Sequence, residues 1–257
     1  MAMIHFSFRE SFLVMTSTRF QNPVSGAVPV SFCVLGFGEE VHWASLALME
    51  CLRARGYRIT GLMPQADDAQ WREGGWRSVR LKQLQGASSF EFPASALCSM
   101  AQREPREQLA GVVDVEAVVD SFAALATWVD LVVVDALGEP AGGLAPNMGD
   151  VAQALGLPVV IACEDTEEAL QKACKLVYQL RARKLRVVAW VQSGLQPMAC
   201  AAGIPCVGSI PAVDLPEPAR AARHVDAMRL LEALLPEAGP RSVAVSANAR
   251  KTGDRMH

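Results

Sequence analysis

Residues 34–43, VLGFGEEVHW, place two glycines directly after an apolar run and follow them with two glutamates and a histidine. Glycines between a strand and a helix are typical of loops that hold phosphate groups, because N–H groups at a helix start attract anions. Gly36, Gly38, Glu40 and His42 are therefore candidate residues of a nucleotide loop. The segment contains no lysine. It indicates either a nucleotide site with unusual residues or the remains of one.

Metal–thiolate chemistry has little support in the sequence. The seven cysteines are scattered through apolar segments without a C-x-x-C pair, which is typical of reduced, buried thiols in the cytoplasm. The histidines at positions 5, 42, 224 and 257 supply no closely spaced pair of zinc ligands. We therefore expect a cytoplasmic protein without such a site.

The charge balance argues against a nucleic-acid partner. The net charge is −3, and acidic residues balance the basic cluster at 181–186, which we interpret as a solvated helix end. No run approaches the ~18 apolar residues of a membrane-spanning helix, so we expect no membrane partner. Residues 1–28 are predicted to be a poorly ordered leader, 29–238 a single domain and 239–257 a flexible tail.

Short apolar runs alternate with amphipathic segments along this domain. Strands are predicted at 28–35, 57–63, 130–136, 157–163, 185–192 and 204–210, and helices at 44–55, 115–129, 166–184 and 222–235. Residues 64–90 are polar and aperiodic, and we interpret them as an excursion from the sheet. Asp165 and Glu168 resemble a capping box at the start of the third helix.

This alternation predicts an α/β fold with a doubly wound, mainly parallel sheet covered by helices on both faces. Ligands of such sheets bind beyond the carboxyl ends of the strands. Those ends are predicted at 36–43, 63–68, 135–143, 163–166, 192–196 and 209–214.

Read in order, these strand ends resemble the dethiobiotin synthetases, a family of the P-loop class that includes the MinD-type ATPases. RARGYRITGLMP is similar to the family's G-Y-x-x-x-G-x-K-P, FEFPASALCSMAQREP to E-P-x-S-P-H-x-A, and DLVVVDALGEPAGG to a strand ending in E-G-A-G-G. LGLPVVIAC, LRVVAWVQS and CVGSIP match three later stretches. The resemblance covers roughly residues 30–235 and implies a P-loop NTPase fold.

The family's functional residues are largely replaced. Its loop, G-T-D-T-x-V-G-K-T, holds phosphate with the lysine and Mg²⁺ with the threonine, whereas the matching pair here is Val41–His42 or Trp43–Ala44. The lysine of G-x-K-P becomes Met63, and the helix start that should carry a metal-binding aspartate, GGWRSVRLKQL, offers Ser78 and no acid.

The remaining matched positions differ in how closely they retain the residue types of the family. The glutamate of E-G-A-G-G becomes Asp135, which the resemblance makes a candidate metal ligand, and the adenine-reading asparagine becomes Ser193. Pro211 retains the proline of L-G-x-I-P beside that base-binding place. Pro93 and Ser95 retain the P-x-S segment, which together with Met63 marks a former substrate pocket.

Each replaced residue also has a purely structural interpretation. Gly36 and Gly38 would then only turn the chain, and the glycines of AGG at 141–143 would only shape a loop. His42 would pack the first helix onto the sheet, and Asp135 would be a structural hydrogen-bond acceptor.

Three functions stay open. The first is a pseudoenzyme that needs no cofactor and acts as a binding or regulatory partner. The resemblance implies a homodimer or a heterodimer with an active family member. The second is an active ligase that uses ATP and Mg²⁺ to close the ureido ring of dethiobiotin from 7,8-diaminononanoate and CO₂. A lysine that reaches the loop from elsewhere, such as Lys82, would favour it. The third is a small-molecule binder whose pocket is made apolar by Met63, Trp43 and Trp71.

Overall fold

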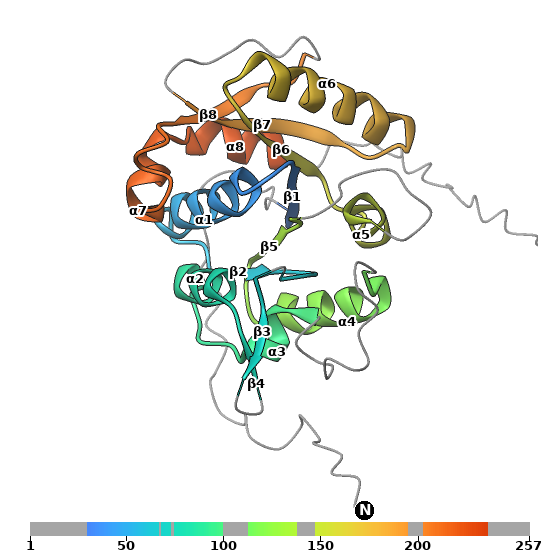
Figure 1. Cartoon of the computed structure of the whole chain (residues 1–257), viewed down its shortest axis with the longest axis vertical. Coiled ribbons are helices and arrows are strands. Elements are labelled where there is room, and N and C mark those ends of the chain that lie inside the picture. Colours follow the sequence, from blue (N-terminus) through green and yellow to red (C-terminus); the bar gives the residue numbers. More distant parts are fainter. Residues whose placement is uncertain are drawn as a thin grey trace, which may run out of the picture.

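A six-stranded parallel sheet forms the centre of the molecule in the computed structural model, which describes residues 30–66, 68–72, 75–99, 113–137, 147–194 and 203–235 (Figure 1). The strand order is β2-β5-β1-β6-β7-β8, and every neighbouring pair is parallel. The strands are β1 (Phe32–Gly36), β2 (Ile59–Leu62), β5 (Leu131–Asp135), β6 (Val159–Glu164), β7 (Val187–Ser193) and β8 (Cys206–Ile210). The predicted fold class is confirmed.

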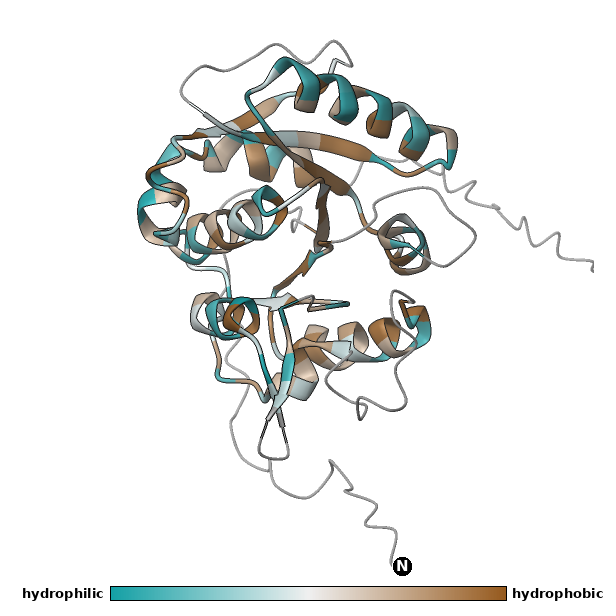
Figure 2. Cartoon of the chain, in the orientation of Figure 1, coloured by the Kyte–Doolittle hydropathy of each residue, from teal (hydrophilic) through white to brown (hydrophobic). Residues whose placement is uncertain are grey.

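The strands are apolar because helices cover the sheet on both faces. The sequence of β5, LVVVD, is buried at every position, as expected for a central parallel strand that meets water on neither side. Helices α1 (Glu40–Arg53) and α2 (Val79–Ala87) lie on one side of the sheet, and α4 (Val115–Ala126) and α5 (Met148–Leu155) on the other (Figure 1). Figure 2 shows the hydrophobic strands at the centre and, on α6, a hydrophilic side that faces away from them.

The other helices are α3 (Ala94–Leu97), α6 (Glu167–Ala182), α7 (Pro218–Ala221), the 3₁₀ turn η3 (Ala222–His224) and α8 (Ala227–Leu234). The predicted cap of α6 was wrong. Thr166, and not Asp165, is the N-cap, because its hydroxyl accepts a hydrogen bond from the Ala169 N–H at 3.2 Å. The last helix starts at Ala227, later than predicted, because Asp226 caps it.

The described residues of 64–90 lie outside the six-stranded sheet, as predicted, but they form regular elements that the sequence did not predict. This segment contains the antiparallel hairpin β3 (Gln70–Arg72) and β4 (Gly75–Arg77), followed by α2. Trp71 and Trp76 face each other across the hairpin with ring centroids 5.4 Å apart. Two three-residue strands are too short to show an alternating pattern, and α2 buries only three side chains, so neither element has a strong periodicity in the sequence.

The predicted leader 1–28, the predicted tail 239–257 and the AGG motif at 141–143 lie outside the described residues. Among the helices that the structure describes, none is long and apolar enough to span a membrane.

Candidate functional site

The loop between β1 and α1 is shaped by its two glycines. A side chain at Gly36 would place its Cβ 2.1 Å from the carbonyl oxygen of Ala162, so glycine is required where β1 approaches β6. Gly38 has a φ of 75°, a left-handed conformation that glycine adopts without strain. Both glycines therefore have a structural role in the turn.

The carboxylate of Glu40 lies within this loop. Its Oε2 atom is 2.8 Å from the position that a Cβ on Gly38 would take. Burial raises the pKa of Glu40; its own backbone N–H, which donates to the carboxylate, opposes this, and the nearby carboxylates of Glu164 and Glu39 raise the pKa further. Glu164 at the end of β6 therefore lies close enough to Glu40 for its carboxylate to disfavour the charged form of Glu40. An acidic side chain thus lies at the helix start, where N–H groups attract anions.

The cavity beside the loop is also acidic. It has a volume of about 240 Å³, and its lining includes Glu40, Glu164, Glu168 and Lys172. Lys172, the only cation among the described residues of this lining, forms an ion pair with Glu168 at 2.7 Å. Three carboxyl groups around one engaged cation disfavour a bound triphosphate.

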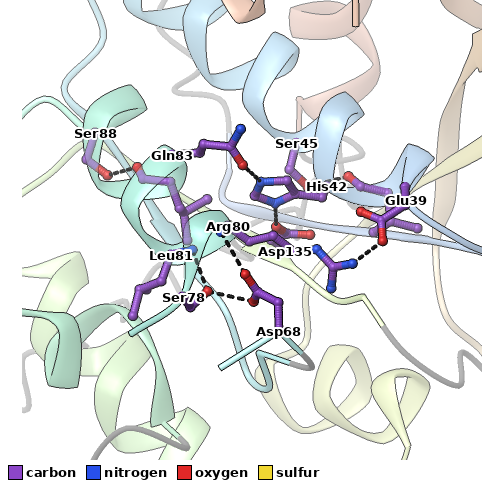
Figure 3. Close-up of polar contacts among 12 residues, drawn as sticks. Glu39, His42, Ser45, Asp68, Ser78, Arg80, Leu81, Gln83, Ser88 and Asp135 are labelled. Carbon is purple, nitrogen blue, oxygen red and sulfur yellow. Dashed lines mark hydrogen bonds and ion pairs between the residues drawn. The ribbon is translucent and has the colours of Figure 1, made fainter. Parts of the chain in front are cut away.

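His42 and Asp135 form a buried pair beneath the loop. Nδ1 of His42 donates to Oδ2 of Asp135 at 2.5 Å, and neither side chain is exposed to solvent. Nε2 of the same ring lies 3.1 Å from Oε1 of Gln83 on α2 (Figure 3). Burial lowers the pKa of His42, but the hydrogen bond and the charge of Asp135 outweigh it, so the pKa is raised. With an oxygen at each ring nitrogen, the charged imidazolium is favoured.

Helix α2 also supplies an arginine to the loop. Arg80 forms an ion pair with Glu39, and its charge opposes protonation of His42 (Figure 3). Asp68 fixes the start of α2, because it accepts hydrogen bonds from the Ser78 hydroxyl at 2.6 Å and from the Val79 N–H at 2.8 Å. An acid therefore does lie at this helix start, although the sequence motif offered none.

Sequence reasoning missed several of these partners. Arg80 and Gln83 share one face of α2, a spacing visible in the sequence, but nothing local shows that this face meets the loop. Glu164 lies in the range 163–166 that the strand-end rule marked. Asp68 is ten residues before Ser78, so no motif joins them.

These residues do not fit Mg²⁺ and ATP. Oδ2 of Asp135 is engaged by His42, while its Oδ1 is buried and has no hydrogen-bond partner within the described ranges. The guanidinium of Arg80 adds positive charge near the place where a divalent cation would sit. In the part of the chain that the structure describes, no three His, Cys, Asp or Glu side chains are arranged to hold a metal ion.

Of the predicted substrate-pocket residues, Met63 is a core residue, whereas Pro93 and Ser95 are exposed. The side chain of Met63 is fully buried, its N–H donates to the Leu97 carbonyl at 2.7 Å, and it bridges to Cys98 at the end of α3. Pro93 is the N-cap residue of α3, and Ser95 is an exposed residue within it. The end of the second strand therefore contacts the end of α3, the helix that Pro93 caps.

At the base-binding end, Ser193 ends β7 and Pro211 follows β8. A cavity of about 10 Å³ lined by Glu40, Ser193 and neighbours lies there, room for at most one water molecule. A purine ring would not fit into it without movement of its walls.

The tryptophans and lysine of the open hypotheses are placed apart. Trp43 packs beside the ring of His42 on α1, at 5.6 Å between centroids, whereas Trp71 is on the hairpin. Lys82 lines a different depression, between the hairpin and α2, and not the cavity beside the loop.

Comparison with known proteins adds sequence relatives. The ATP-dependent dethiobiotin synthetase BioD of Ralstonia nicotianae (strain ATCC BAA-1114 / GMI1000) is 30% identical over 209 residues, which is 73% of this chain and 90% of the relative. That of Xanthomonas axonopodis pv. citri (strain 306) is 30% identical over 165 residues, covering 60% of this chain and 72% of the relative. No family model matches the sequence.

Among solved structures, the MinD cell division protein of Aquifex aeolicus is similar with a TM-score of 0.53 and 12% identity, covering 80% of this chain and 98% of that one. The same protein in a MinC:MinD complex is similar with a TM-score of 0.51 and 12% identity, again over 80% of this chain and 98% of that chain. These similarities show the P-loop NTPase fold.

Proposed function

This chain belongs to the dethiobiotin synthetase family, and from that premise we propose that it has lost ATP-dependent catalysis and acts as a pseudoenzyme, a binding or regulatory partner. The observation that carries the proposal is the carboxylate of Glu40 inside the loop, whose Oε2 lies 2.8 Å from the position of a Cβ on Gly38 and whose pKa is raised by burial and by the nearby carboxylate of Glu164. A carboxylate at this place repels a phosphate that approaches the N–H groups of the helix start.

The pairing of His42 with Asp135 supports the same conclusion. Phosphoryl transfer depends on positioning and on charge stabilisation by a cationic side chain and Mg²⁺. Here the ionisable group on the first turn of α1, His42, is neutralised by Asp135 and shielded from solvent. Because a charged hydrogen bond contributes about 1.5–3 kcal/mol, losing the loop lysine and two metal ligands costs several decades of affinity and rate.

A second candidate is the ATP-dependent ligase activity for which the relatives are named. The observation in its favour is Arg80, a cation from α2 that reaches the loop and whose Nη1 is buried without a hydrogen-bond partner in the described residues. This candidate requires Glu39 to release Arg80 and Glu40 to leave the loop. We favour the pseudoenzyme because both changes would have to occur together.

Nucleotide binding tests the proposal directly. A ligand with a Kd of ~10 μM at 1 mM stabilises a fold by ~2.7 kcal/mol, which for this size corresponds to a rise in Tm of about 5–11 °C. We expect a Kd for Mg-ATP in the millimolar range or weaker, and hence a rise of at most about 1–2 °C in differential scanning fluorimetry.

The control for this measurement is tripolyphosphate at equal ionic strength. A Mg²⁺-dependent rise above about 5 °C with ATP but not with tripolyphosphate would show a working nucleotide site. It would refute the pseudoenzyme proposal.

We also propose a subunit partner, either a second copy of this chain or an active member of the family. The support is the retained P-x-S segment with Pro93 and Ser95, which the resemblance places at the subunit interface. Size-exclusion chromatography with light scattering is expected to give a dimer of about twice 27.6 kDa, alone or after mixing with the Ralstonia relative. A monomer in both experiments would contradict this proposal.

A further inference from the structure

The segment between β8 and α7, residues 211–217, has few connections to the rest of the described chain. Its backbone hydrogen bonds are local turns, from the Asp214 N–H to the Pro211 carbonyl at 2.9 Å and from the Glu217 N–H to the Asp214 carbonyl at 3.0 Å. Within the described residues, no backbone hydrogen bond joins positions 212–216 to a strand or a helix. The segment can therefore move without breaking the sheet.

Two side chains of this segment are turned towards the protein. Leu215 is half-buried against the core and lines a cavity of about 10 Å³ together with Ala44 of α1 and Ser193 at the end of β7. Asp214 is buried and faces α7 and η3, which pack against α1 (Figure 1). We propose that residues 211–217 form a strap, in which Leu215 closes the carboxyl ends of β7 and β8 and Asp214 holds the strap closed.

Asp214 pairs with two basic side chains. Its Oδ2 accepts a hydrogen bond from Nε2 of His224 at 3.0 Å, and its Oδ1 lies 3.0 Å from Nη2 of Arg220 in an ion pair without hydrogen-bond geometry. Arg220 also pairs with Glu217, a second carboxylate of the strap, at 3.2 Å. The side chain of Arg220 is 51% exposed and that of His224 37%, so water and salt reach both. Exposed ion pairs hold a segment weakly enough for it to open.

Opening of the strap enlarges the cavity beside the loop between β1 and α1. Glu40 and Cys163 line both that cavity, of about 240 Å³, and the cavity of about 10 Å³ behind Leu215. Withdrawal of Leu215 joins the two and exposes the ends of β7 and β8. The strap is thus an autoinhibitory contact that limits what this site can hold. It closes a catalytic and a non-catalytic site alike, so it is independent of the proposed pseudoenzyme function.

Thiol labelling measures the opening. Ala44 is buried and lines the cavity behind Leu215 but not the larger one, so Ala44→Cys places a thiol behind the strap. Its alkylation by iodoacetamide, followed by peptide mass spectrometry of the full chain, should be at least about tenfold slower than at the exposed end of α6 in Ala182→Cys. Adding Asp214→Asn to Ala44→Cys should accelerate the alkylation at least about fivefold, because it removes the charge that holds the strap.

Two controls separate the ion pairs from a general loss of stability. Asp130→Asn removes a carboxylate that pairs with Arg58 at the other end of the sheet, and it should leave the alkylation rate unchanged. Raising the salt from about 0.1 M to about 1 M shortens the Debye length from about 10 Å to about 3 Å. It should accelerate the alkylation in Ala44→Cys and have no such effect once Asp214→Asn is present.

Two further variants keep the proposal testable if Asp214→Asn fails to fold. Arg220→Gln/His224→Gln breaks the same contacts from the exposed side, and Leu215→Ala removes the closing side chain, so each should accelerate the alkylation at least about fivefold. Circular dichroism shows which variants are folded. The proposal is overturned if the thiol behind the strap reacts as fast as the exposed one, if the folded variants react no faster, or if Asp130→Asn accelerates the reaction as much.

Discussion

Incubated with 7,8-diaminononanoate, bicarbonate and Mg-ATP, the purified protein is expected to form dethiobiotin at a rate at least about three decades below ~1 s⁻¹, the low end of ordinary enzymes. The physical reason is the charge at the loop. Glu40 and Glu164 lie where negative phosphate oxygens would have to bind, and no lysine of the loop offsets them. Removing a lysine and two metal ligands, at one to two decades each, accounts for the expected loss.

Product formation can be followed by mass spectrometry, with the Ralstonia relative as the positive control in the same buffer. Turnover near ~1 s⁻¹ would end the pseudoenzyme proposal. It would then be informative to replace Arg80, the cation that reaches the loop. If Arg80→Ala abolished that turnover, the arginine would have taken over a role of the missing lysine.

The second large effect is expected on stability. Asp135→Ala should lower the free energy of unfolding by about 3–5 kcal/mol, because it leaves the His42 imidazolium buried without its partner. For a chain of this size the Tm should fall by about 6–20 °C. Urea denaturation followed by circular dichroism measures the change. A loss below about 1 kcal/mol would show that the pair does not stabilise this region.

Asp130→Ala is the matched control, since Asp130 directly precedes the same strand and pairs with Arg58 in an exposed ion pair whose side chains are 34% and 44% exposed. Surface ion pairs typically contribute at most about 1 kcal/mol, so this variant should be nearly neutral. Equal losses from the two substitutions would contradict a special role for the buried pair.

The pH dependence of stability follows from the same pair. Burial lowers the pKa of His42, but Asp135 raises it by more, so the folded chain holds a proton that the unfolded chain releases near pH 6.5. The stabilisation is complete below that pH and is lost as the pH rises through the raised value. The groups facing His42 are Asp135, Gln83 and Arg80. His42→Gln should remove this dependence of the unfolding free energy above pH 6.5. The raised pKa of Glu40 gives a separate decrease in stability, which begins near the ordinary pKa of 4.5.

The sequence could predict the fold because its information on the sheet is local. A buried run such as LVVVD at 131–135 has no other stable place than a central parallel strand, so its assignment needs no knowledge of its neighbours. The hairpin and α2 could not be found in this way. Their short strands and few buried side chains leave no periodic pattern, and Trp71 meets Trp76 only after the turn has formed.

The sequence likewise predicts some features of the candidate site and not others. The sequence by itself determined which residues are missing, because the loop lysine and the second lysine would occupy fixed positions in a motif and Met63 stands in one of them. It could not determine what replaced them. His42 and Asp135 are 93 residues apart, and Arg80 is 41 residues from Glu39.

Only the tertiary structure decided that these residues meet. The strand order places β5 next to β1, so Asp135 comes to lie beneath the helix that carries His42, while α2 packs against α1 and presents Gln83. Such pairings depend on which strands and helices are neighbours, and a local sequence pattern does not show which elements pack together. The same packing brings Glu164 at the end of β6 close enough to Glu40 to raise the pKa of Glu40.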